Sequence, residues 1–228
     1  QQRVIQLGED PKRVFLVGGL GIDNIKKLKL LDRASLEESL DIKFNEKNIL
    51  ITFHPVTLEK NSTKHQMKEL LAALEDMGNT QLIFTMPNAD TDGRVLFKLI
   101  NEFVSTHENA CVFTSMGQLR YLSCLNYIDM VIGNSSSGII EVPSFKKATI
   151  NIGDRQRGRI KAESILDCEP KKSAIKKTIT AVYSQEFQTK LSNVINPYGS
   201  GGASNAIIKV LEKTVLRNIL KKQFYNLL

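Results

Sequence analysis

The sequence predicts an α/β fold in which helices cover both faces of a parallel sheet. Short apolar runs, such as residues 48–53 and 130–132, have the composition of strands that are buried on both faces. Between such runs, apolar residues recur at helical spacing, as Met67, Leu70 and Leu74 do before Gly78 ends the pattern. Because the two patterns alternate along the chain, right-handed crossovers between parallel strands are the expected connections.

The first part of the chain is less regular. Residues 1–8 have the pattern of a helix that ends at Gly8, and residues 9–11 form a break. Residues 14–17 are predicted to form a short strand, and the glycines in 18–21 a sharp turn before a helix that begins near Asp23. The stretch 30–44 is predicted to be a connecting helix with Ser35 as its N-cap.

From residue 48 the order becomes regular, because each apolar run is followed by a turn and then by a helical stripe. The expected strands are 48–53, 81–86, 110–114, 130–132 and 148–152, and the expected helices between and after them are 62–77, 95–104, 116–125 and 137–142. Helices near 171–183 and 185–191 follow. A glycine-rich break at 196–202 then precedes a last, largely basic helix that begins near Ala203.

Composition limits the kinds of partner. The 228 residues are 42% hydrophobic, which is enough for a core, and the net charge of +7 favours an anionic ligand. Tryptophan is absent and basic residues do not interleave with aromatic ones, so a nucleic-acid partner is not expected. No apolar stretch approaches the length of a membrane span, so no membrane partner is expected either.

The cysteines and the first residue indicate the setting of the protein. Cys111, Cys124 and Cys168 lie in or beside apolar runs, as buried thiols do in a reducing compartment, and no signal-like segment begins the chain. We therefore expect a cytoplasmic protein. The chain begins with Gln1 and not with methionine, which leads us to expect a piece of a longer protein.

In an open parallel sheet, ligands bind in the crevice at the carboxyl ends of the strands. The loops that would line this crevice are 18–21, 54–57, 87–93, 115–118 and 133–137. In the last of them, Asn134, Ser135 and Ser136 are good N-cap residues, and the backbone N–H groups of the helix that follows would suit a phosphate. Glu141, one turn later, could accept hydrogen bonds from two ribose hydroxyls. The alternative is an ordinary turn whose serines only cap the helix.

Other side chains could also take part in the chemistry. His54 follows a buried strand and precedes Pro55, so its imidazole would be held at the crevice, where it could bind phosphate or transfer a proton; a loop histidine of no consequence is the alternative. Arg155 and Arg159 could clamp a diphosphate, although arginines in a basic loop are more often solvated. The histidines and cysteines lack the spacing of metal ligands, and no P-loop or dinucleotide fingerprint indicates a cofactor.

The chain carries several motifs in one order: T-F-H-P-V-T (52–57), M-P-N-A-D (86–90), S-M-G-Q-L-R-Y-L (115–122), G-N-S-S-S-G-I-I-E (133–141), G-D-R-Q-R-G-R (153–159) and N-P-Y-G (196–199). Together they resemble the second half of the UDP-N-acetylglucosamine 2-epimerase family along nearly the whole chain. The 153–159 segment is similar to the hydrolysing branch, which makes N-acetylmannosamine and free UDP for sialic acid synthesis.

This resemblance implies two Rossmann-like domains that face a cleft, as in B-type glycosyltransferases (the GT-B fold). Residues 12–202 would be the second, UDP-binding domain, residues 1–11 the end of the preceding domain and a linker, and residues 203–228 a C-terminal helix that is a candidate to dock on the absent N-terminal domain.

The resemblance also implies roles for particular residues. Ser135 and Ser136 would hold the diphosphate, Glu141 the ribose hydroxyls, and His54 would be the catalytic residue near the phosphates and the sugar. The backbone at Ser115, Met116 and Gly117 would hold the uracil. Asn88, Asn134 and Arg155 complete the predicted UDP-binding residues, and the loop of Asn88 also matches a segment implicated in feedback binding of activated sialic acid in animal members.

The implied reaction is anti elimination of UDP followed by syn addition of water, with acid and base carboxylates in the absent domain. This chain alone is therefore expected to be inactive, and the full-length protein to be a homo-oligomer. Three alternatives remain: a hydrolysing 2-epimerase for a UDP-2,4-diacetamido-trideoxyhexose, as in legionaminic acid synthesis; a B-type glycosyltransferase that uses a UDP-sugar; and a non-catalytic binding module.

Overall fold

The computed structural model describes residues 1–56, 62–87, 93–217 and 219–226. The chain contains two compact units. Leu28–Pro197 forms the larger one, and Gln1–Lys27 forms the smaller one together with Tyr198–Leu228. The domain boundaries predicted at residues 12 and 202 stay a prediction.

The larger unit is built on a sheet of six parallel strands in the order β3-β2-β1-β4-β5-β6. The strands are β1 Lys47–Thr52, β2 Thr80–Thr85, β3 Ala110–Phe113, β4 Met130–Gly133, β5 Ala148–Ile152 and β6 Ile165–Cys168. This arrangement confirms the predicted α/β class with a Rossmann-like parallel sheet.

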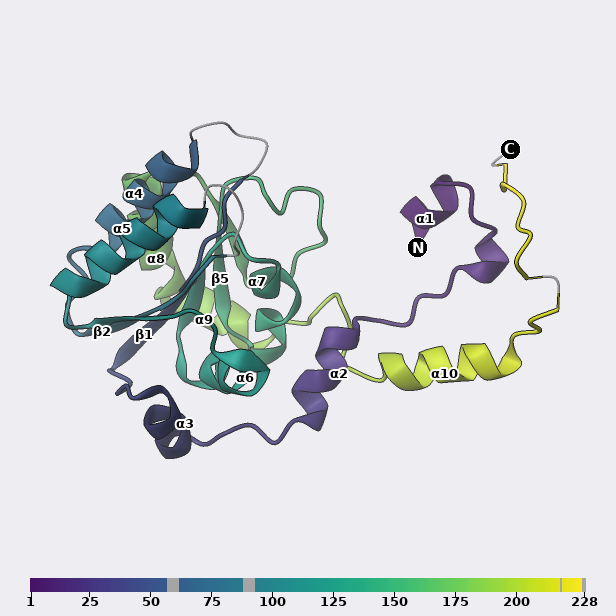
Figure 1. Ribbon diagram of the computed structural model, residues 1–228, viewed down its shortest axis with the longest axis horizontal. Helices are drawn as coiled ribbons and strands as arrows, with labels where there is room; N and C mark the ends of the chain where they lie inside the picture. Colours follow the sequence, from purple (N-terminus) through teal and green to yellow (C-terminus); the bar gives the residue numbers. More distant parts are fainter. Residues whose placement is uncertain (57–61, 88–92, 218, 227–228) are drawn as a thin grey trace. The chain divides into compact units, whose positions relative to one another are not determined.

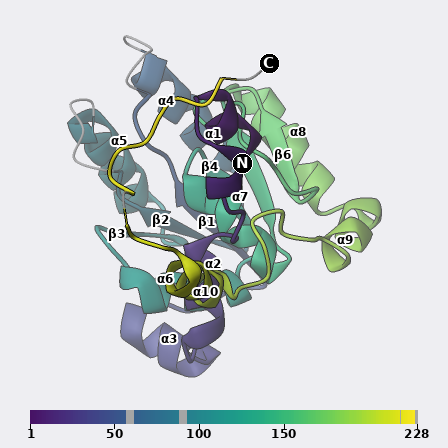
Figure 2. The ribbon, with the colours of Figure 1, turned by 90° about the vertical axis from the view of Figure 1, so that its right-hand side faces the viewer.

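Helices cover both faces of this sheet. Helix α4 packs against α5 and α8, whereas α3 packs against α6, and Figure 2 shows strands β1 and β2 between α4 and α5 on one side and α3 and α6 on the other. The helices of this unit are α3 Arg33–Leu40, α4 Ser62–Leu74, α5 Gly93–Thr106, α6 Gly117–Tyr127, α7 Ser136–Ile140, α8 Lys172–Val182 and α9 Gln185–Ser192, with a 3₁₀ turn η2 at Val142–Phe145. Because helices lie on both faces, every residue of β4 and β5 is buried.

Strand β6 is not among the strands predicted from the sequence. Asp167 interrupts its apolar run, and this carboxylate is exposed at the edge of the sheet. There, Asp167 Oδ1 accepts hydrogen bonds from Asn151 Nδ2 (2.7 Å) and Lys161 Nζ (2.6 Å). An edge strand that is open to solvent on one side does not need a continuous apolar sequence.

The strand predicted at 14–17 is wrong, and the turn at 18–21 therefore does not follow a strand. The segment pairs with no strand of the described chain, and Phe15 and Leu16 are 54% and 79% exposed. A high apolar content favours burial, but a strand also needs a neighbour for its backbone hydrogen bonds. The segment instead lines a cavity of about 420 Å³ in the smaller unit, together with Ile207, Val210 and Leu211.

The smaller unit consists of α1 Gln2–Gln6, a 3₁₀ turn η1 at Pro11–Arg13, α2 Leu20–Lys27 and α10 Ala203–Lys213 (Figure 1). Asp23 of α2 joins two of these helices. Its carboxylate accepts hydrogen bonds from Gly202 N (2.7 Å), Ala203 N (3.1 Å) and both the N and Oγ of Ser204. The Ser204 hydroxyl, followed by the backbone donors at the start of α10, lowers the pKa of Asp23 to about 2.

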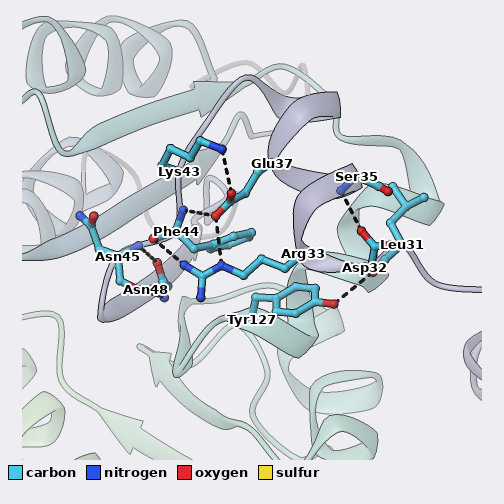
Figure 3. A network of polar contacts seen from close by, with 10 residues as sticks. All are labelled: Leu31, Asp32, Arg33, Ser35, Glu37, Lys43, Phe44, Asn45, Asn48 and Tyr127. Carbon is cyan, nitrogen blue, oxygen red and sulfur yellow. Dashed lines mark hydrogen bonds and ion pairs between the residues drawn. The ribbon is translucent and has the colours of Figure 1, made fainter.

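Helix α3 differs from the predicted connecting helix. It is shorter, and its N-cap is Asp32, whose Oδ1 accepts a hydrogen bond from Ser35 N at 2.8 Å. Beyond it, Glu37 accepts from Arg33 Nε, Lys43 Nζ and Phe44 N at 3.0–3.1 Å, as Figure 3 shows. These contacts hold the connection from α3 to β1. Among the described residues, no helix has the length and apolar character needed to cross a membrane.

Candidate functional site

The strand order places a topological switch point between β1 and β4. Connections from β1 lead toward β2 and β3 on one side, whereas connections from β4 lead toward β5 and β6 on the other. The loops that leave β1 and β4 therefore diverge, and this leaves a crevice outside their carboxyl ends where ligands bind in open α/β sheets.

A cavity of about 400 Å³ lies at this position. Its lining comes from the carboxyl ends of β1 and β2, the start of α6, and the segment after β4. The lining residues are Thr52, His54, Thr85, Met86, Thr114, Ser115, Met116, Gly117, Gln118, Tyr121, Leu122, Ser135, Ser137 and Glu141. The predicted site residues His54, Ser115, Met116, Gly117, Ser135 and Glu141 are thus brought together around one space.

The end of β4 requires glycine. Gly133 has a φ of +144°, and a Cβ atom at this position would lie 1.9 Å from the carbonyl oxygen of Thr52 in the neighbouring strand. The absence of a side chain lets the chain turn closely against β1. The next residue, Asn134, donates its backbone N–H to the same Thr52 oxygen at 3.2 Å.

Asn134 holds the backbone of His54. Its Oδ1 accepts from His54 N at 2.7 Å, and its Nδ2 donates to His54 O at 2.9 Å. Asn134 is 1% exposed and His54 is 9% exposed, so this contact is sheltered from water. Asn134 therefore fixes the loop that carries the imidazole, while its predicted contact with UDP stays a prediction.

The serine turn forms a capped but short helix. Ser135 is the N-cap of α7, with its Oγ 3.4 Å from Ser137 N, and α7 has only five residues. Ser135 lines the cavity, whereas Ser136 is not among the lining residues. Gly138 lets α7 approach β5, because a Cβ there would lie 2.7 Å from Thr149 Cγ2.

Glu141 lies at the C-terminal end of α7 and is joined to two hydroxyl groups. Ser137 Oγ donates to Glu141 Oε2 at 2.5 Å, and Tyr121 OH lies 2.5 Å from Ser137 Oγ. All three side chains line the cavity. The carboxylate thus faces the space from which a ligand hydroxyl could reach it.

The predicted uracil-binding segment lies at the start of α6. Gly117 has a φ of +67°, which favours glycine, and its N–H lies 3.3 Å from Ser115 Oγ. Met116 is buried, and its carbonyl oxygen accepts from Arg120 Nε at 2.7 Å. The side chain of Ser115 is exposed at the same edge of the cavity.

Comparison with known proteins identifies the family. The family profile described as UDP-N-acetylglucosamine 2-epimerase matches residues 1–212. This chain belongs to that family.

Two relatives match over the whole chain. A GDP/UDP-N,N'-diacetylbacillosamine 2-epimerase (hydrolyzing) from Campylobacter jejuni is 39% identical, and the polysialic acid biosynthesis protein P7 from Escherichia coli is 35% identical. This chain spans 59% and 58% of the lengths of these relatives. The structure of MnaA from S. aureus with UDP is similar in fold, with a TM-score of 0.73 at 16% identity; the match covers 99% of this chain and 60% of MnaA.

Three described residues that are predicted to bind UDP, namely Asn134, Ser136 and Arg155, are not among the residues that line the cavity. Arg155 Nη1 donates to Asn134 O at 3.0 Å, beside Gln156 Nε2, which donates to the same oxygen at 2.8 Å. Arg155 thus holds the loop after β5 against the serine turn. Asn88 lies outside the described residues. The ligand roles of all these residues stay predictions.

Sequence reasoning did not predict Tyr121 and Ser137 as site residues. A signal was present, because Ser137 and Glu141 are four residues apart and such residues lie on the same face of a helix. Tyr121 belongs to a different helix, α6, and no pattern within the sequence indicates that its hydroxyl meets Ser137.

Proposed function

We propose that this chain is the UDP-binding half of a hydrolysing UDP-sugar 2-epimerase. The observation that carries the proposal is the cavity at the β1–β4 switch point, where His54, Ser135 and Glu141 line one space of about 400 Å³. Membership of the 2-epimerase family supports the reaction class.

In this proposal, each part of UDP meets a different group. Ser135 and Ser136 bind the diphosphate, with backbone N–H groups of the same turn as further donors. Glu141 accepts hydrogen bonds from the ribose hydroxyls, and residues 115–117 lie against the uracil. His54 lies near the phosphates and the sugar and assists the departure of UDP as a proton donor.

Two sugars are candidates for the substrate. The motifs and the similarity to a polysialic acid biosynthesis protein support UDP-N-acetylglucosamine, which would give N-acetylmannosamine and UDP. The 39% identity to a diacetylbacillosamine 2-epimerase supports a UDP-2,4-diacetamido-trideoxyhexose as the second candidate.

Titration calorimetry of the chain tests the nucleotide site. UDP is expected to bind more tightly than uridine. The double change Ser135→Ala and Ser136→Ala should weaken the binding of UDP and of pyrophosphate but not the binding of uridine. Ser192→Ala, at an exposed serine of α9 whose hydroxyl donates to Thr189 O at 2.8 Å, is the matched control. An absence of UDP binding, or an equal loss for uridine and UDP, would contradict the site.

Product analysis tests the reaction and the sugar. The natural protein, with whatever residues flank this chain, would be incubated with each UDP-sugar and the products examined by mass spectrometry. Release of UDP with a free 2-epimerised amino sugar supports the proposal, and the ratio of kcat/KM identifies the preferred sugar. Transfer of the sugar to an acceptor, with a new glycosidic bond, would instead indicate a glycosyltransferase.

A further inference from the structure

Tyr121, Ser137 and Glu141 form a chain of hydrogen bonds along one wall of the cavity. Ser137 Oγ lies 2.5 Å from both the Tyr121 hydroxyl and Glu141 Oε2. The three groups come from α6, α7 and the residue that ends α7, so the chain joins two helices at the wall of the site.

The direction of the hydrogen bonds follows from the number of hydrogens. Ser137 has one hydroxyl hydrogen and donates it to the Glu141 carboxylate, so the Tyr121 phenol donates to Ser137. Burial raises the pKa of Tyr121 and the charge of Glu141 raises it further, while the hydrogen bond to Ser137 opposes both effects. The phenol therefore stays protonated at neutral pH and remains a donor.

We propose that Tyr121 and Ser137 are positioning residues that hold Glu141 in the orientation needed to accept a hydrogen bond from a ribose 2′-hydroxyl. The cavity would thereby select ribonucleotides over 2′-deoxyribonucleotides. This inference rests on the proposed function, in which UDP occupies the cavity.

The physical basis is preorganisation of the acceptor. A glutamate side chain at a cavity wall has several rotamers, and binding a ligand through it normally loses that freedom. Here Ser137 holds Oε2 before any ligand arrives, and Tyr121 holds Ser137. No group of the described residues donates a hydrogen bond to Glu141 Oε1, so this oxygen is available to a ligand hydroxyl.

The test compares the affinities of UDP and 2′-deoxy-UDP. Tyr121→Phe and Ser137→Ala should each lower the affinity for UDP by about 3- to 10-fold, which is the effect of one neutral hydrogen bond. The affinity for 2′-deoxy-UDP should stay nearly unchanged. Ser137→Thr retains the hydroxyl and should restore the preference for UDP. The double variant should lose no more UDP affinity than Ser137→Ala alone, because Tyr121 acts on Glu141 only through the Ser137 hydroxyl.

Tyr127→Phe is the matched control. Tyr127 also belongs to α6, and its hydroxyl donates to Leu31 O at 3.3 Å, outside the cavity lining. Its removal should change the melting temperature but not the ratio of UDP to 2′-deoxy-UDP affinity. Melting curves of all variants show that each is folded at the temperature of titration.

The outcomes separate this inference from the proposed function. If the parent chain does not bind UDP, both fail. If it binds UDP and Glu141→Gln abolishes the ribose preference while Tyr121→Phe and Ser137→Ala leave the preference intact, only the positioning role is overturned. Equal weakening of UDP and 2′-deoxy-UDP in these two variants would likewise overturn it, because a general structural effect does not distinguish the two ligands.

Discussion

Asn134 connects three segments around the candidate site. Its side chain exchanges two hydrogen bonds with the His54 backbone, and its carbonyl oxygen accepts from Arg155 and Gln156 in the loop after β5. Within the described chain, Gln156 Oε1 is buried without a hydrogen-bond partner. Asn134 thus holds the loop of His54 through its side chain and the loop after β5 through its carbonyl oxygen.

Asn134→Asp should destabilise the fold and weaken UDP binding. The carboxylate cannot donate to His54 O, so a buried carbonyl loses its partner, at a cost of about 1–3 kcal/mol in the free energy of unfolding. The His54 loop should then shift, and the added negative charge should repel the diphosphate. Urea denaturation and UDP titration measure the two effects separately.

Asn48 offers a matched control for this change. Its side chain makes the same pair of hydrogen bonds with the backbone of Asn45, at 2.8 and 3.1 Å, and Asn48 lies at the opposite end of β1. Asn48→Asp should cost similar stability and leave UDP affinity unchanged. Equal effects of both variants on UDP affinity would show that Asn134 acts only through stability.

At the scale of single residues, the sequence is a better guide to site residues that directly follow strands than to residues whose side chains join two helices. His54, Ser135 and Glu141 follow the ends of β1 and β4, so parallel topology alone brings them to one crevice. The Tyr121–Ser137 contact depends on how α6 packs beside α7, which no local pattern specifies. Arg155 donates to Asn134 O at the edge of the site, but composition alone does not distinguish an arginine that contacts the backbone from one that contacts a ligand.

Among the elements, the connection from α3 to β1 depends on one carboxylate. Glu37 accepts from Phe44 N, Lys43 Nζ and Arg33 Nε, and Arg33 Nη2 also donates to Phe44 O at 2.7 Å (Figure 3). The hydrogen bond from Phe44 N is the first cause that lowers the pKa of Glu37 to about 2, from 4.5. Folding therefore favours the ionised carboxylate.

The sign of this shift predicts a pH dependence of stability. Because the folded pKa is depressed, the contribution of Glu37 is fully present above about pH 4.5 and is lost as the pH falls toward about 2. Glu37→Gln should therefore have a lower urea midpoint than the parent at pH 6. The difference between the two midpoints should become smaller as the pH falls from about 4.5 toward about 2. Urea titrations at several pH values between 2.5 and 7 are the measurement.

Glu102 serves as the control for Glu37. It pairs with Lys98 at 3.7 Å on the surface of α5, where both side chains are largely exposed. Glu102→Gln should change the free energy of unfolding by about 0.5 kcal/mol or less. A constant difference between Glu37→Gln and the parent at every pH would refute the titration argument.

The elements that the sequence predicts well are those buried on both faces. The apolar runs 49–51 of β1 and 130–132 of β4 are continuous because the sheet is covered on both sides, so hydrophobicity alone reveals them. Strand β5 instead alternates apolar residues with the buried polar residues Thr149 and Asn151. The edge strand β6 contains Asp167 and escapes this signal. The 14–17 segment has the apolar composition of a strand but no neighbouring strand to pair with. The N-cap of α3 is predicted at Ser35 but lies at Asp32, because both residues are good N-cap types and the sequence does not distinguish them.

At the scale of the whole molecule, the strand order determines where a ligand can bind, and membership of the family supports the proposed reaction class. The order β3-β2-β1-β4-β5-β6 creates a switch point, and the cavity lies beside it. This chain nevertheless spans only 59% of the length of its relative from C. jejuni. The side chains that we propose to bind the nucleotide belong to this chain, whereas the remaining part of such a relative lies outside the match.

This division predicts that the chain binds UDP without turning over a UDP-sugar. Elimination of UDP needs a base at the sugar carbon and an acid at the departing oxygen, both within hydrogen-bond reach. The titratable side chains that line the described cavity are His54, Tyr121 and Glu141. Tyr121 has a raised pKa and Glu141 Oε2 already accepts from Ser137, so neither is placed to remove a proton from carbon at neutral pH.

The measurement is release of UDP from UDP-N-acetylglucosamine and from the diacetamido sugar nucleotide, at saturating substrate. We expect UDP binding by calorimetry and no release above the uncatalysed rate. The natural protein, with whatever residues flank this chain, should release UDP, and His54→Ala in that protein should lower kcat by about 10²-fold or more if the imidazole assists the departure of UDP. Turnover by the 228-residue chain alone would show that its own residues supply the acid and the base, and an unchanged kcat in the His54 variant would remove this residue from the mechanism.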